Sequence, residues 1–145
     1  MSQSCQLVAI MFTDIVGYTA LMGHDEEKAF TILNKNRALQ KPIIEQYNGR
    51  WIKEPGDGVM ASFDTVSDGV NAVIKIMEAC NATKEFQLRI GIHQSEVVFE
   101  NEDVFGDGLY RLHLHIALLT LYQFSFVKNC LKHLRKIVWL LALLL

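Results

Sequence analysis

One short segment, Arg50 to Asp64, constrains the fold more than any other part of this chain. Its sequence, RWIKEPGDGVMASFD, places two runs of strand-forming residues on either side of Gly56-Asp57-Gly58. An Asp-Gly pair between such runs is a strong hairpin signal, because glycine accepts the positive φ that tight hairpin turns require. The segment therefore predicts a β-hairpin with the Asp57 carboxylate at its tip.

A second carboxylate follows an apolar run near the start of the chain. Residues Leu7 to Phe12 have the composition of a central strand that is covered on both faces. The next residues, TDIVGYT, contain Asp14 and a glycine, so Asp14 is expected where the strand gives way to a loop and then a helix. Two aspartates at the ends of neighbouring strands form a candidate site for two divalent cations, because hard cations prefer carboxylate oxygens.

Helical patterns occupy two further segments. Residues 25–47 combine acidic residues at the start with apolar residues at helical spacing, and Asn48-Gly49 is typical of a helix C-terminus. Pro42 is expected to kink or restart that helix. Residues 66–77 carry a second apolar stripe at helical spacing, after a potential N-cap at residues 64–65.

The last regular pattern alternates with the period of a strand. Residues 86–92 alternate apolar and polar side chains, and residues 96–100 form a second run after an expected turn at Gln94-Ser95. The resulting order is strand, helix, strand, strand, helix, strand, strand. It predicts an α+β fold, a ferredoxin-like βαββαβ sandwich in which helices pack on one face of a mainly antiparallel sheet.

Composition favours one domain followed by an atypical tail. The chain has 145 residues, 50% of them hydrophobic, which is enough to bury one core. A net charge of -2 argues against non-specific nucleic-acid binding as the main activity. Residues 110–145 contain no Gly, Pro, Asp or Glu, and their apolar runs are shorter than the ~20 residues of a membrane span. This tail is interpreted as a core helix, an interfacial segment in contact with a membrane, or a replaced end that does not fold with the rest.

The start of the chain and its cysteines give expectations about the compartment. The residues MSQSCQ lack the basic and then apolar pattern of a secretory signal, so a cytoplasmic location is expected. The three cysteines, Cys5, Cys80 and Cys130, share no metal-ligand spacing. They are expected to be reduced, isolated thiols.

Four motifs occur in one order on this alternation of strands and helices: FTDIVGYT, WIKEPGDGVMASF, LRIGIHQSEV and EDVFGDG. Together they resemble the catalytic domain of class III nucleotidyl cyclases, the adenylate and guanylate cyclase family, over about residues 7–109. The resemblance implies a catalytic domain in residues 1–109. It implies a reaction in which the ribose 3′-hydroxyl of a nucleoside triphosphate attacks its own α-phosphorus and expels pyrophosphate. It also implies a head-to-tail homodimer, in which each site takes metal ligands from one chain and base-selecting residues from the other.

The resemblance assigns roles to individual residues. Asp14 and Asp57 match the catalytic metal ligands for two Mg²⁺ or Mn²⁺ ions, and the Ile15 carbonyl matches a backbone ligand. A glycine-containing loop matches the segment whose backbone amides hold the triphosphate at a helix start. The loop residues in question are Gly17, Tyr18 and Thr19.

Two further residues match the positions that select the base. Lys53 lies four residues before Asp57, and Asp103 opens the DVFGDG motif. Adenine offers a donor at its amino group and an acceptor at N1, so an aspartate acceptor with a lysine donor suits adenine. The pair therefore favours ATP as the substrate.

The sequence departs from the family pattern after GDG. The family has an asparagine there and an arginine four residues later, where this chain has Tyr110 and Leu114. Leucine cannot donate a hydrogen bond, and losing one donor to the transition state commonly costs ~100-fold to 1000-fold in rate. Ser95 stands where the family usually has glycine, and is expected to strain the turn. The sequence thus predicts an impaired adenylate cyclase or, alternatively, a catalytically inactive nucleotide-binding or dimerisation module of this family.

Overall fold

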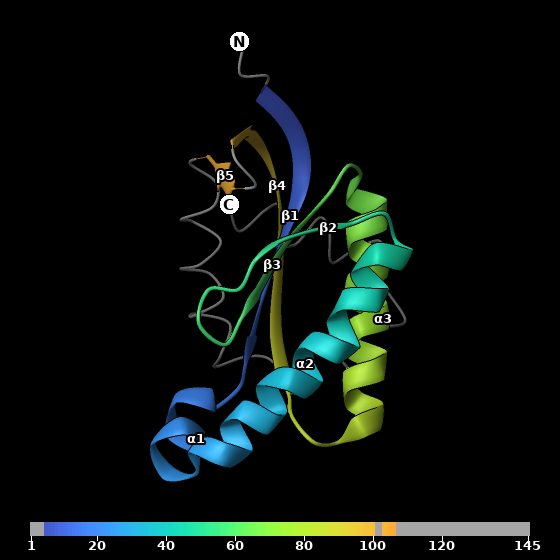
Figure 1. The fold of residues 1–145 in the computed structure, drawn as a ribbon. Coiled ribbons are helices and arrows are strands. Elements are labelled where there is room, and N and C mark those ends of the chain that lie inside the picture. Colours follow the sequence, from blue (N-terminus) through green and yellow to red (C-terminus); the bar gives the residue numbers. More distant parts are fainter. Residues whose placement is uncertain (1–4, 101–102, 107–145) are drawn as a thin grey trace.

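Figure 1 presents a computed structural model of the chain, which describes residues 5–100 and 103–106. Its elements in order are β1 (Cys5–Ile15), α1 (Tyr18–His24), α2 (Glu26–Gln46), β2 (Arg50–Lys53), β3 (Val59–Phe63), α3 (Val66–Thr83), β4 (Leu88–Glu100) and β5 (Asp103–Phe105). The strands form one five-stranded sheet in the order β2-β3-β1-β4-β5, and all of its pairings are antiparallel. The α+β class predicted from the sequence is confirmed.

The two long helices lie side by side on one face of the sheet (Figure 1). The Asp25 carboxylate caps α2 by accepting a hydrogen bond of 3.0 Å from the Lys28 backbone N–H. In the same way, the Thr65 hydroxyl caps α3 through the Asp68 backbone N–H at 3.1 Å. These caps satisfy amide groups that have no acceptor inside the helix, so the local sequence sets where each helix begins.

The C-terminal end of α2 agrees with the sequence in one respect and differs in another. Asn48 adopts a positive φ of 57°, and the Gly49 N–H donates to the Ile44 carbonyl at 2.8 Å, which closes the helix as predicted. Pro42 does not restart the helix, since α2 continues through it to Gln46. Proline removes one backbone hydrogen bond, but the burial of Ile43 and Ile44 against the core holds the last turn in place.

Two features of the sheet region differ from the sequence prediction. A short helix, α1, precedes α2 as a separate element. The predicted turn at Gln94-Ser95 is absent, because β4 runs unbroken from Leu88 to Glu100. Both residues pair with β1 in one continuous register, Gln94 opposite Ala9 and Ser95 opposite Val8. Ser95 therefore lies within a strand, and the strain expected for it in a turn does not arise.

Alternate residues of β1 contribute to two different parts of the core. Ala9, Met11 and Ile15 are buried in the cluster that includes α2 and α3. The β1 residues that alternate with them, Val8, Ile10 and Phe12, pack into a second cluster with Met60, Val97 and Val104. Because side chains alternate along a strand, Asp14 belongs to the face opposite the two long helices.

The sheet is strongly curled. The Arg50 guanidinium of β2 lies 4.6 Å from the centroid of the Phe99 ring in β4, although two strands separate β2 and β4 in the sheet order. The edge strands β2 and β5 also contact one another. The curl thus brings the two edges of the sheet together.

Within residues 5–100 and 103–106, no helix is both long enough and apolar enough to cross a membrane. Cys5 is exposed and Cys80 is buried, and both are free thiols. Cys130 and the tail, residues 110–145, lie outside the described residues.

Candidate active site

The predicted hairpin is present between β2 and β3, with Asp57 at its tip. Gly56 adopts a positive φ of 63°, and the Gly58 N–H donates a hydrogen bond of 3.1 Å to the Pro55 carbonyl. The turn therefore uses the backbone freedom of Gly56, which precedes Asp57, whereas the Asp-Gly signal placed the positive φ at Gly58.

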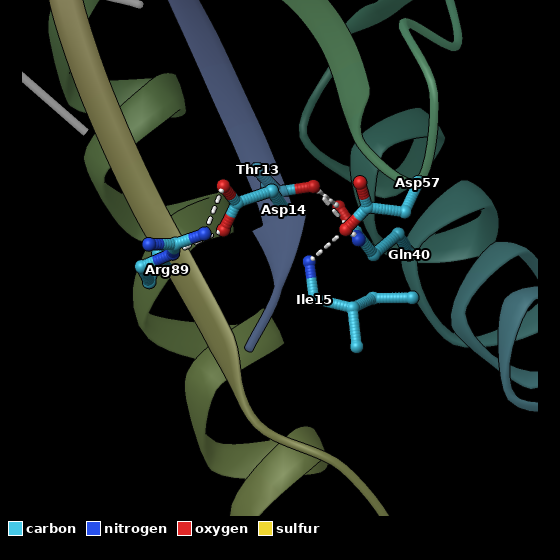
Figure 2. Close-up of polar contacts among 6 residues, drawn as sticks. All are labelled: Thr13, Asp14, Ile15, Gln40, Asp57 and Arg89. Atoms are coloured by element: carbon cyan, nitrogen blue, oxygen red, sulfur yellow. Dashed lines mark hydrogen bonds and ion pairs between the residues drawn. The ribbon is translucent and has the colours of Figure 1, made fainter. Parts of the chain in front are cut away.

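The tip of this hairpin is attached to the end of β1. The Asp57 Oδ2 accepts a hydrogen bond of 2.8 Å from the Ile15 backbone N–H (Figure 2). Next to this bond, the backbone of Gly58 lies so close to the Thr13 carbonyl oxygen that an added Cβ would overlap with that oxygen. Only glycine allows this approach. Two independent contacts thus hold Asp57 beside the strand that carries Asp14.

Asp14 itself is held by Arg89. The Arg89 Nε donates to Asp14 Oδ1 at 2.6 Å, and the Arg89 Nη2 donates to Asp14 Oδ2 at 2.7 Å (Figure 2). The two residues are direct partners across the β1 and β4 strands. Their side chains are 27% and 20% exposed, so the ion pair is only partly screened by solvent. A two-point pair of this kind fixes the orientation of the carboxylate.

The donor set at this end of the sheet fits a hard divalent cation. Figure 2 shows the carboxylates of Asp14 and Asp57 on either side of the end of β1, with Ile15 between them. Within the described residues, no group of three or more His, Cys, Asp and Glu side chains comes together as a closed metal site. Mg²⁺ commonly binds through one or two carboxylates, together with substrate phosphates and water, and does not require such a closed site.

The loop that follows β1 leads directly into α1. Gly17 is the N-cap of α1 with a positive φ of 74°, and its carbonyl accepts a hydrogen bond of 3.0 Å from the Leu21 N–H. No side chain caps this helix start, so the amide groups of its first turn, including Tyr18 and Thr19, receive no hydrogen bond from a capping side chain. The role of these three residues in triphosphate binding stays a prediction.

Asp103, one of the two predicted base-selecting residues, lies far from Asp14. Asp103 pairs with Glu100, beyond the pairing of Val98 with Cys5 at the start of β1. Asp14 lies near the other end of this strand of 11 residues. An extended strand of that length measures roughly 35 Å along its path. Figure 1 accordingly shows β5 near the start of β1, and α1 at the opposite end of the sheet.

Lys53 ends the edge strand β2, opposite Met60 of β3. Met60 in turn pairs with Phe12, two residues before Asp14, so Lys53 lies two strands away from Asp14 but in the same hairpin as Asp57. Since β2 and β5 contact one another through the curl, the strands that carry Lys53 and Asp103 lie close together.

Three buried polar side chains lie beside the site, and the sequence analysis had assigned them no role. Thr13, Asn36 and Gln40 are at most 3% exposed. The Gln40 Nε2 donates to Thr13 Oγ1 at 3.0 Å and to Asn36 Oδ1 at 2.6 Å, which links α2 to the residue before Asp14. The available signal was the polar pair at positions i and i+4 within the apolar stripe of α2.

Comparison with known proteins identifies the family. The family described as "Adenylate and Guanylate cyclase catalytic domain" matches residues 1–107 of this chain. The Rhizobium meliloti (strain 1021) protein named "Putative adenylate cyclase 3" is 30% identical over 112 residues, which cover 72% of this chain and 19% of that protein. The chain belongs to the adenylate and guanylate cyclase family, and it spans about a fifth of the length of this relative.

Solved structures show the same fold. The adenylate/guanylate cyclase/hydrolase from Silicibacter pomeroyi matches with a TM-score of 0.72 and 31% identity, covering 79% of this chain and 72% of that chain. A bacterial light-regulated adenylyl cyclase matches with a TM-score of 0.75 and 18% identity, covering 90% of this chain and 46% of that chain. The resemblance predicted from the four motifs is therefore confirmed at the level of family and fold.

Proposed function

We propose that this chain is an adenylate cyclase domain, which converts ATP to 3′,5′-cyclic AMP and pyrophosphate by two-metal catalysis at a dimer interface. The observation that carries the proposal is that the Asp57 hairpin and the end of β1, the strand that carries Asp14, lie together at one end of the sheet. Two backbone contacts hold them there, namely the Ile15 N–H on Asp57 and the Gly58 backbone against Thr13.

In this proposal the chain's own groups bind and orient the substrate. Asp14, Asp57 and the Ile15 carbonyl hold the cations, and the amides of residues 17–19 bind the triphosphate. Bound Mg²⁺ or Mn²⁺ supplies charge neutralisation at the phosphates and lowers the pKa of the attacking hydroxyl. The ribose 3′-oxygen forms a bond to the α-phosphorus, its proton is released, and the bond to the bridging oxygen breaks to release pyrophosphate.

Asp14 lies near the end of β1, whereas Asp103, in β5, lies near the start of β1, and this separation supports a site shared between two chains. If Lys53 and Asp103 select adenine for a site whose metal ligands are Asp14 and Asp57, a second chain brings them there most simply. A head-to-tail homodimer supplies two such sites related by symmetry. The names of the relatives include both adenylate and guanylate cyclases, and the Lys53 and Asp103 pair favours adenine in this chain.

The second candidate function is a nucleotide-binding or dimerisation module without catalysis. It is favoured by Tyr110 and Leu114, which replace the expected transition-state donors. Both residues lie outside the described part of the chain, in the proposed tail of residues 110–145. The proposed catalytic domain, residues 1–109, is supported by a family match that extends to residue 107.

The two candidates differ in one assay. Cyclic AMP production is measured at saturating Mn²⁺ and ATP, with a dimeric sample of the full chain. The wild type is expected to be at least ~100-fold slower than a rate of about 1 per second, because its donors are missing. The variant Tyr110→Asn with Leu114→Arg should recover much of that loss. A double variant without any cyclic AMP, in a sample that binds ATP, would favour the non-catalytic module.

A further inference from the structure

The ion pair between Asp14 and Arg89 uses both oxygens of a carboxylate that the proposed function assigns to a metal. Oδ1 accepts a hydrogen bond from Arg89 at 2.6 Å, and Oδ2 accepts another from Arg89 at 2.7 Å. The guanidinium carries a permanent positive charge, because its pKa lies far above the physiological range. In this structure, Arg89 therefore supplies the positive charge beside the Asp14 carboxylate, where a bound cation would otherwise supply it.

This pairing follows from the register of the sheet and needs no loop movement. Asp14 and Arg89 are opposite each other in β1 and β4, in a register that continues without a break from Cys5 to Ile15. Side chains that face each other across neighbouring strands lie within contact distance on the same face. The curled sheet thus holds the guanidinium at the carboxylate whenever these strands are paired.

We propose that Arg89 is a positioning residue that competes with the divalent cation for the Asp14 carboxylate. The proposal rests on the proposed function, since it takes Asp14 as a metal ligand. A Mg²⁺ ion binds a carboxylate oxygen at about 2.0 to 2.1 Å, which is closer than any hydrogen bond of the guanidinium. Each oxygen has a further lone pair for a cation, but two positive groups on one carboxylate repel one another, so cation binding weakens the hydrogen bonds from Arg89.

The competition lowers the affinity of the site for a cation on its own. A partly buried, bidentate Arg and carboxylate pair is stronger than an exposed single contact, so replacing it is costly. Removal of the guanidinium is expected to tighten cation binding by about tenfold. Arg89 in this account suppresses metal binding by the empty protein, and orients Asp14 until a cation arrives.

The test measures the binding of Mn²⁺ alone to the full chain, by the loss of the electron paramagnetic resonance signal of free Mn²⁺. Wild type is compared with Arg89→Gln and Arg89→Lys, with folding checked by circular dichroism. Arg37→Gln is the matched control, because Arg37 also forms an ion pair, with Glu54 on a more exposed part of the surface. Arg89→Gln should bind Mn²⁺ about tenfold more tightly than wild type, while Arg37→Gln should bind it as wild type does.

Arg89→Lys separates competition for the oxygens from a general effect of charge. Lysine keeps the positive charge but cannot offer the planar fork that engages both oxygens. Competition therefore predicts tighter Mn²⁺ binding in Arg89→Lys as well, by a smaller factor. If Arg89→Lys equals wild type, or if both variants bind Mn²⁺ no more tightly than wild type, the proposal is overturned.

A measurement on the wild type applies even if the Arg89 variants fail to fold. The Nε–H signal of Arg89 is followed by nuclear magnetic resonance while Mg²⁺ is added, after assignment through its covalent neighbours. The signal should shift or exchange faster as Mg²⁺ binds. A signal that stays constant up to saturating Mg²⁺ would overturn the proposal.

Titration of wild type with ATP in the presence of Mn²⁺ distinguishes this proposal from the proposed function. If wild type binds ATP in the presence of Mn²⁺ but the Arg89 variants show no gain in affinity for Mn²⁺ alone, the proposed competition by Arg89 is wrong and the proposed function stands. If the variants gain affinity for Mn²⁺ but neither wild type nor any variant binds ATP, the proposed competition by Arg89 stands and the proposed function is wrong.

Discussion

The backbone N–H of Ile15 donates a hydrogen bond of 2.8 Å to the Asp57 carboxylate, across 42 residues of sequence. Ile15 directly follows Asp14, so this bond attaches one candidate metal ligand to the strand that carries the other. Ile15 is buried, with 3% of its surface exposed, and its side chain anchors this end of β1 in the core. The position of Asp57 therefore depends on how closely the hairpin approaches β1.

The close approach of Gly58 to β1 predicts a large effect of a small substitution. In Gly58→Ala, the new Cβ would overlap with the Thr13 carbonyl oxygen, so the hairpin tip must move away from β1. Urea unfolding should show a loss of about 1 to 3 kcal/mol, since overpacking against backbone costs that much. The variant should also bind ATP with Mn²⁺ more weakly than wild type.

Gly23→Ala is the matched control for this substitution. A Cβ at Gly23 meets no atom within 4 Å, and the residue lies within the helix α1. Alanine is favoured over glycine in a helix by up to ~1 kcal/mol, so Gly23→Ala should be neutral or stabilising. Equal losses of stability in the two variants would show that the contact at Thr13 has no special role.

The sequence predicted those parts of the site that depend on local chemistry. The hairpin tip at Asp57 was predictable because Asp-Gly between two strand-forming runs specifies a turn within a few residues. The break in β4 was predicted wrongly, because the polar Gln94-Ser95 pair has the composition of a turn. The partners of these residues in β1 lie more than 80 residues away, and long-range pairing overrode the local pattern.

The contacts of Asp14 could not be predicted from spacing. Arg89 lies 75 residues from Asp14, and only the register of β1 against β4 places them opposite each other. The link from Gln40 to Thr13 likewise depends on where α2 crosses the sheet. Motif resemblance supplied candidate residues, and the structure supplied their partners.

Base selection by Lys53 and Asp103 predicts a preference for ATP over GTP. In competition binding, ATP should displace a fluorescent nucleotide from wild type at a lower concentration than GTP. The double variant Lys53→Glu with Asp103→Cys should lose much of this preference. Lys75→Glu, at an exposed position of α3, serves as a charge control and should keep this preference. Equal competition by the two nucleotides in wild type would contradict the assignment.

The distance between Asp14 and Asp103 along β1 predicts complementation between chains. Asp14→Ala and Asp103→Ala should each bind ATP with Mn²⁺ poorly. A mixture of the two should regain binding, because one heterodimer interface contains an intact set of residues. Sedimentation must confirm that the mixture forms dimers. Dimers without any recovery would mean that the residues do not act across an interface.

The central claim is that Asp14 and Asp57 together hold the cations that bind the nucleotide. Calorimetric titration of ATP in the presence of Mn²⁺ tests it directly, with wild type, Asp14→Ala, Asp57→Asn and the exposed control Asp64→Asn. Asp57→Asn keeps an oxygen that can accept the Ile15 N–H, so it removes charge with little change in the turn. Wild type and Asp64→Asn should bind alike, and the two site variants should lose at least about tenfold in affinity. Unchanged affinity in both site variants would contradict the account.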